Sequence, residues 1–293
     1  MSGSEAPLEI AERALALAGA DAQVTVVSER SLMSRFARSA PTQATAIDDT
    51  SVEILCLRGG HTAIASTNRL DSDALRATAA RAEAAALAAA RSGPGTYPGL
   101  AGPAEPFEHD GFDADTAQLD PETAAAALRD AFAVAGDHAL EAFGVWSAGD
   151  VHTAIAATTG LRLDDRVSDA FMKVVCRDRD GRSGYAVDAA PAAAALDPAA
   201  LARRAASKVA PEPLAQLGPG SYPVVLEPEA VGLLLEFLAA LALNGLAHAE
   251  GRGALAGRLG TPVAAPCISL HDDPLAGGTL PHAFDMELSL IHI

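Results

Sequence analysis

The sequence predicts an α+β protein in which helices flank two blocks of antiparallel strands. The first observation is a change of period, because apolar residues recur at helical spacing over 8–18 and short strand-like segments follow over 23–67. The second is the pair Gly59-Gly60, which accepts the positive φ of a hairpin turn. The third is another strand-rich stretch over 139–190, interrupted by a turn at Thr159-Gly160. Strands joined by tight turns pair antiparallel, and the flanking helices complete an α+β layer.

The first block, residues 1–93, is predicted to form an N-terminal α/β domain. Its first helix ends at Gly19, and Asp71 caps a long alanine-rich helix that ends near Ser92. Between these helices we expect strands at 23–29, 31–40, 42–48, 51–58 and 61–67. Residues 94–120 are rich in glycine, proline and acidic residues, which indicates a connection and not a regular element.

The second block, residues 121–287, is predicted to be a β-rich C-terminal domain, followed by a tail at 288–293. Its helices begin at Asp120-Pro121, Asp197-Pro198 and Glu227-Pro228, where an acidic residue precedes proline at the first helical position. In this block we expect strands at 139–148, 151–158, 161–165, 167–177, 183–190 and 221–226.

Composition limits both the core and the partners. The 293 residues are 49% hydrophobic but only 4% aromatic, and alanine makes up much of the apolar share, so we expect a thin core. Lysine and arginine number 21 against 38 acidic residues, and the net charge of −17 argues against binding to nucleic acid or anionic lipid. The most apolar run, 231–246, is interrupted by Glu236 and Asn244 and is too short to span a membrane.

Cysteine usage and the N-terminus indicate the compartment. Cys56, Cys176 and Cys267 are far apart and odd in number, which favours buried, reduced thiols over a disulfide framework. The first residues are polar and do not have the order of a signal peptide. Together these features predict a cytoplasmic protein.

Polar residues near the C-terminus are the first candidates for chemistry. Four histidines lie in the last fifth of the chain: His248, His271, His282 and His292. None has another histidine three or four residues away, so solvated loop histidines are expected more than a zinc site. Asp272-Asp273 precedes proline, which is typical of a turn, and we interpret Asp164-Asp165 and Asp48-Asp49 in the same way.

Glu236 is the polar anomaly of the last predicted helix. It lies within the apolar run Leu233–Leu238, where a carboxylate either belongs to a solvent-facing stripe or points into a cleft. The pattern leaves both possibilities open. A self-sufficient hydrolase would use Glu236, His248 or the cluster His271-Asp272-Asp273.

Several stretches, in order along nearly the whole chain, resemble the TldD/PmbA family. Its members are also called modulators of DNA gyrase and are classed with metallopeptidases. The resemblance is carried by Ala14–Ala20, Gly59–Asn68, Thr158–Arg162 with Asp178–Gly184, Gly220–Pro228, Leu255–Gly260, and Asp272–Pro274 with Phe284–Glu287. It implies an α/β N-terminal domain and a β-rich C-terminal domain of flattened-barrel type, incomplete here.

The family comprises two kinds of subunit that pair as a heterodimer. The catalytic kind carries His-Glu-x-x-x-His on the helix after a Pro-Val-Val-Leu strand, where two histidines bind zinc and the glutamate is the general base. On this chain the motif falls on Leu235, Glu236 and Ala240. Leucine and alanine donate no electron pair to zinc. The resemblance therefore implies no metal, cofactor or catalytic residue on this chain, although Glu236 aligns with the general base.

The chain is thus similar to the partner kind, TldE (PmbA). This implies a non-catalytic subunit of an intracellular zinc metalloprotease that processes peptides or small unfolded proteins. Zinc is then expected on a TldD-like homologue that bears His-Glu-x-x-x-His. The alternatives are a self-sufficient metallopeptidase of the same family and a stand-alone peptide-binding protein. After Glu287 the family's glycine and further strands are missing, so we expect a C-terminally truncated chain with a tail outside the family pattern.

Overall fold

The computed structural model describes residues 5–19, 21–118, 120–209, 216–271, 273, 275–276, 280–285 and 288. The chain divides into two units, one of residues 1–209 with 274–293 and the other of residues 210–273. None of the helices in these described ranges is long and apolar enough to cross a bilayer.

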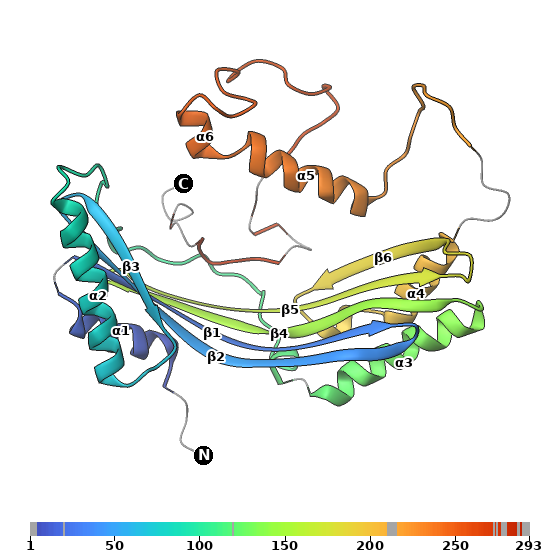
Figure 1. Cartoon of the computed structure of the whole chain (residues 1–293), viewed down its shortest axis with the longest axis horizontal. Helices are drawn as coiled ribbons and strands as arrows, with labels where there is room; N and C mark the ends of the chain where they lie inside the picture. Colours follow the sequence, from blue (N-terminus) through green and yellow to red (C-terminus); the bar gives the residue numbers. More distant parts are fainter. Residues whose placement is uncertain are drawn as a thin grey trace. The chain divides into compact units, whose positions relative to one another are not determined.

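The first unit is built on an open, six-stranded antiparallel sheet (Figure 1). The strands are β1 (Ala22–Ala37), β2 (Ala40–Arg58), β3 (His61–Thr67), β4 (Glu141–Ala157), β5 (Arg162–Arg177) and β6 (Ser183–Ala190). Their order across the sheet is β3-β2-β1-β4-β5-β6, so the two predicted blocks meet at the pairing of β1 with β4. The α+β class is confirmed, and the predicted hairpin at Gly59-Gly60 joins β2 to β3.

The strands are longer than predicted. Segments expected as separate strands merge into β1, β2, β4 and β5. Arg30, at one of the expected interruptions, stays in the ladder between Asp48 of β2 and Asp150 of β4. Opposite charges on neighbouring strands stabilise the sheet, so a polar residue there does not signal a turn. The turn after β1 instead falls at Arg38-Ser39, where both residues have positive φ.

Four helices pack on one face of this sheet (Figure 1). They are α1 (Pro7–Leu17), α2 (Ser72–Ala90), α3 (Pro121–Asp137) and α4 (Pro198–Ser207). Trp146 of β4 belongs to the α3–α4 core, and Ala156 of the same strand belongs to the α1–α2 core. Side chains an even number of residues apart share a face, so both helix pairs lie on the same side. The predicted N-caps Asp71, Asp120 and Asp197 each accept hydrogen bonds from helix N–H groups.

Alanine supplies much of the core, which lets helices approach the sheet closely. Ala131, Ala135, Ala202 and Ala205 are all buried between α3, α4 and the strands. A Cβ at Gly184 of β6 would lie 2.0 Å from the carbonyl oxygen of Ala205, so only glycine allows α4 to pack at this depth. A third, smaller cluster lies on the face of the sheet opposite the four helices. Its members include Leu161, Leu163, Ala283 and Phe284.

The described part of the second unit contains α5 (Pro228–Ala242), α6 (Gly245–Ala249) and otherwise irregular chain. The strand predicted at 221–226 does not form, because a strand needs a hydrogen-bonded neighbour and no other strand is present in the described part of this unit. The flattened-barrel domain therefore stays a prediction. In the first unit, two short 3₁₀ turns that were not predicted lie at Thr116–Gln118 and Ala193–Ala195.

The three cysteines differ in exposure, which gives a direct chemical test. Cys56 and Cys176 are buried as predicted, whereas Cys267 is exposed. Burial raises the pKa of the Cys56 and Cys176 thiols, so both their access and their thiolate fraction are low. We expect a thiol reagent such as DTNB to react rapidly with one thiol of the native chain at pH 8, and with all three in urea. Rapid reaction of two or three thiols in the native chain would contradict the buried positions.

Candidate functional site

Helix α5 carries the residues aligned with the metal motif. Proline at its first position and a nearly continuous apolar sequence favour the helix. Leu235, Glu236 and Ala240 are all exposed within their unit. In the described ranges Glu236 makes no hydrogen bond and no ion pair. Glu236 thus lies on a solvent-facing surface of α5 and not in a cleft of this unit.

The side chains of α5 do not fit a zinc ion. Of the three motif positions, Leu235 and Ala240 present only carbon and Glu236 supplies one carboxylate, whereas a protein zinc site takes at least three ligands. Across the described parts of the chain, no group of three or more His, Cys, Asp or Glu side chains could hold a metal ion.

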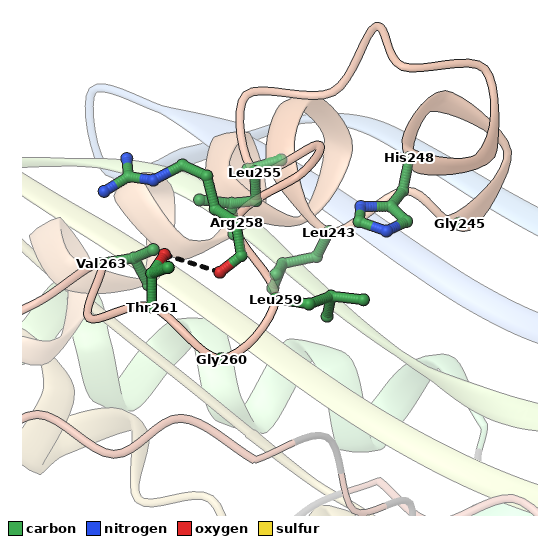
Figure 2. A pocket seen from close by; sticks show the side chains of 10 residues that line it. Leu243, Gly245, His248, Leu255, Arg258, Leu259, Gly260, Thr261 and Val263 are labelled. Carbon is green, nitrogen blue, oxygen red and sulfur yellow. Dashed lines mark hydrogen bonds between the residues drawn. The ribbon is translucent and has the colours of Figure 1, made fainter.

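A pocket of about 350 Å³ lies at the C-terminal end of α5, bounded by α6 and residues 255–263 (Figure 2). His248 of α6 lines it and is half-buried. The Arg258 guanidinium lies on the far side from His248, and the Thr261 hydroxyl donates to the Arg258 carbonyl oxygen at 2.7 Å. Among the described residues that line the pocket none is acidic, so His248 has no carboxylate partner there.

The residues of the rival hydrolase are not brought together. Glu236 does not line the pocket of His248, although both belong to the second unit. His271 and Asp273 are exposed, and Asp272 lies outside the described residues. Of the two other candidate histidines, the one at 282 belongs to the first unit and the one at 292 lies outside the described residues. Among the described candidates, Glu236 and His248 therefore do not form an acid–base pair in one pocket.

A buried histidine–carboxylate cluster in the first unit was missed by sequence reasoning. Asp165 lies within β5, not in the predicted turn, and its Oδ1 is 2.7 Å from Nε2 of His109. Its Oδ2 accepts from the backbone N–H of Ala283 at 3.1 Å and lies 3.5 Å from Nδ1 of His282. The side chains of His109 and Asp165 are 8% and 6% exposed. The three segments are far apart in the sequence, so no local spacing could have revealed the cluster.

The hydrogen bonds of His109 decide what this cluster can do. The backbone N–H of Gly111 donates to Nδ1 at 3.0 Å, so Nδ1 carries the lone pair and the proton lies on Nε2. The Nε2–H group then donates to Asp165. Because both ring nitrogens are occupied, His109 has no free nitrogen to take a proton from a nucleophile, as a catalytic triad requires. We interpret the cluster as a structural tie among three chain segments.

The neighbouring aspartates show why the turn interpretation was wrong. Asp164 also lies in β5, and its carboxylate is 2.9 Å from Nε2 of His152 on β4. Asp164 and Asp165 are consecutive, so they point to opposite faces and take different partners. Asp48-Asp49 likewise lies in a strand, β2. The partners of Asp164 and Asp165 come from other segments of the chain, which the sequence alone does not display.

Fold and site together define a mixed α/β protein with an open antiparallel sheet, in which α5 has leucine and alanine at the positions of the two motif histidines. Family models match in three places: PmbA/TldA metallopeptidase domain 1 at residues 22–86, the central domain at 114–210 and the C-terminal domain at 219–287. The chain belongs to the PmbA/TldD family, as the sequence resemblance predicted.

Solved structures with this fold include a modulator of a DNA gyrase from Thermotoga maritima. That match has 22% identity and a TM-score of 0.77, and it covers 95% of this chain and 65% of the other. A modulator of DNA gyrase from Bacteroides thetaiotaomicron matches with 17% identity, a TM-score of 0.73, and coverage of 88% and 61%. TldE from Thermococcus kodakarensis matches with 15% identity, a TM-score of 0.59, and coverage of 68% and 46%.

These likenesses establish the fold, and the chain spans less than two thirds of the length of each of these three proteins. A comparison with curated proteins gives no match.

Proposed function

We propose that this chain is a TldE-like, non-catalytic subunit of a metalloprotease heterodimer that processes peptides or small unfolded proteins. The observation that carries the proposal is Leu235 and Ala240 at the two positions where the catalytic kind of subunit has its zinc-binding histidines. Family membership and the fold shared with TldE support it. Catalysis then falls to a TldD-like partner that holds the zinc.

The surface of α5 supports contact with another polypeptide. Leu233, Leu234, Phe237 and Leu241 are each more than half exposed, and at 100° per residue they lie within about 100° of arc on one face of the helix. An exposed apolar patch of this kind marks an interaction surface that another polypeptide can cover. A subunit that completes a protease by association has such a surface.

Reconstitution tests the proposed role. The chain is co-expressed with the His-Glu-x-x-x-His homologue from the same genome, and peptidase activity is measured for each chain and for the mixture. We expect a stable complex whose activity depends on zinc, no activity from this chain alone, and unchanged activity with Glu236→Gln in this chain. Tight binding of one zinc by this chain with peptide cleavage, or loss of turnover in Glu236→Gln, would instead identify a self-sufficient peptidase.

A pull-down from the native host separates the remaining alternative. Recovery of the histidine-bearing homologue supports the subunit role. Recovery of peptides or unfolded proteins without that homologue would favour a stand-alone peptide-binding protein.

A further inference from the structure

The face of the sheet opposite α3 and α4 carries a shallow groove across β1, β4 and β5. Its volume is about 650 Å³, within the range of ligand-binding sites. Met33, Phe143, Val145, Phe171 and Val175 supply apolar side chains from all three strands. These positions are odd-numbered, whereas the helix-covered residues of β4 and β5, such as Trp146 and Met172, are even-numbered. The groove therefore lies on the face that α3 and α4 do not cover, and all of its described lining residues belong to the first unit.

Two cations flank the apolar centre of the groove. The strand register places Arg35, Val145 and Lys173 side by side in one row. Neighbouring strands are about 4.8 Å apart, so the two cationic residues are separated by roughly 10 Å across the sheet. Among the described residues neither the Arg35 nor the Lys173 side chain has a hydrogen-bond or ion-pair partner. In a chain with a net charge of −17, two such cations beside one groove call for an explanation.

The other charged groups of this face lie beyond the centre of the groove. At one end the Arg177 guanidinium stacks over the Phe143 ring at 4.9 Å, and the cross-strand neighbour of Arg177 on this face is the acid Glu141. Toward the other end the acids include Asp169, Glu29 and Asp49, the neighbour of Glu29 on β2. Asp169 lies four residues along β5 from Lys173, or about 13 Å. The groove itself is lined by no acidic residue among those described. The only charged side chains among its described lining residues are therefore the cations Arg35 and Lys173.

We propose that this groove binds a peptide segment that carries two carboxylates beside apolar side chains. The apolar side chains would lie on Val145 and Phe171, and the carboxylates would pair with Arg35 and Lys173. Two cations are too few to replace the counterions of a nucleic acid, which favours a peptide. The backbone groups of β1, β4 and β5 are already paired within the sheet, so recognition comes from side chains and not from strand addition.

This proposal rests on the proposed function, because it names the substrate class that a peptide-processing complex would hold here. Its test needs no partner subunit and no turnover. A failure of binding is therefore distinguishable from a failure of reconstitution.

The test is fluorescence anisotropy with the full chain and two labelled peptides, acetyl-Leu-Glu-Phe-Glu-Leu-amide and its glutamine counterpart. We expect the acidic peptide to bind about tenfold more tightly than the glutamine peptide at low salt, with the difference reduced in 0.5 M salt. The double variant Arg35→Gln/Lys173→Gln is expected to remove that difference. Arg129→Gln, an exposed cation on α3, is the matched control and leaves both affinities unchanged.

The same titrations can also contradict the proposal. It fails if both peptides bind equally, if neither binds, or if the double variant keeps the preference for the acidic peptide. It also fails if a single-stranded oligonucleotide binds more tightly than the acidic peptide and loses this binding in the double variant. Thermal unfolding of each variant checks that it is folded. If the glutamine variant is misfolded, Arg35→Lys/Lys173→Arg replaces it in the test, and because this variant keeps both charges it is expected to retain the preference for the acidic peptide.

Discussion

Asp165→Ala is expected to lower the free energy of unfolding of the first unit by about 3 kcal/mol, because it leaves two buried donors without an acceptor. Those donors are Nε2–H of His109 and the backbone N–H of Ala283. The carboxylate is the point where residues 109, 165 and 283 meet, so its loss also releases the segment that contains Phe284 from β5. Urea unfolding followed by circular dichroism measures the first effect. Hydrogen exchange at residues 280–285 measures the second.

Asp164→Ala is the matched control for this experiment. Its carboxylate also pairs with a histidine, but 46% of the Asp164 side chain is exposed, so the pair contributes at most about 1 kcal/mol. Equal losses in the two variants, or no loss in Asp165→Ala, would show that the buried cluster is not a tie. Asp165→Asn keeps one acceptor oxygen and is expected to fall between the two.

Trp146→Ala is expected to cost about 4 kcal/mol, the second large effect. Trp146 is 2% exposed on β4 and lies in the core that α3 and α4 form with the sheet. Its buried neighbours include many alanines, which have no rotamers that could move to fill the space left by the indole. The cavity therefore stays largely open. Urea unfolding followed by far-ultraviolet circular dichroism measures the loss without relying on tryptophan fluorescence.

Tyr97→Ala provides the comparison for an aromatic side chain outside the core. Tyr97 is 43% exposed on the connection after α2, so we expect a change within about 0.5 kcal/mol. A small loss in Trp146→Ala would mean that the helices collapse onto the sheet, against the packing described.

The sequence predicted the fold class because its local signals are strong. Asp71, Asp120 and Asp197 each begin a helix where the N-cap pattern places it, and Gly59-Gly60 turns the chain between β2 and β3. Strand boundaries were predicted poorly. Polar residues such as Arg30 looked like interruptions, although they remain in strands whose neighbours carry the opposite charge.

The residues of the candidate sites also divide into those that the sequence could predict and those that it could not. The residues at 235, 236 and 240 could be placed from the motif alone, since the absence of metal ligands is a property of residue identity. His109 and Asp165 could not, because 56 residues separate them and neither belongs to a motif. The groove on the sheet was missed for a related reason. Arg35 and Lys173 become neighbours of Val145 only through the register of three strands.

By itself, then, the sequence determined the class of fold, the family and the lack of zinc ligands on α5, because caps, turns and side-chain chemistry are local. Only the tertiary structure decided which charges are buried, which cations have no partner among the described residues, and which face of the sheet α1–α4 cover. These properties depend on pairing between residues distant in the chain, and pairing is fixed when the sheet forms and its alanine-rich helices pack against it.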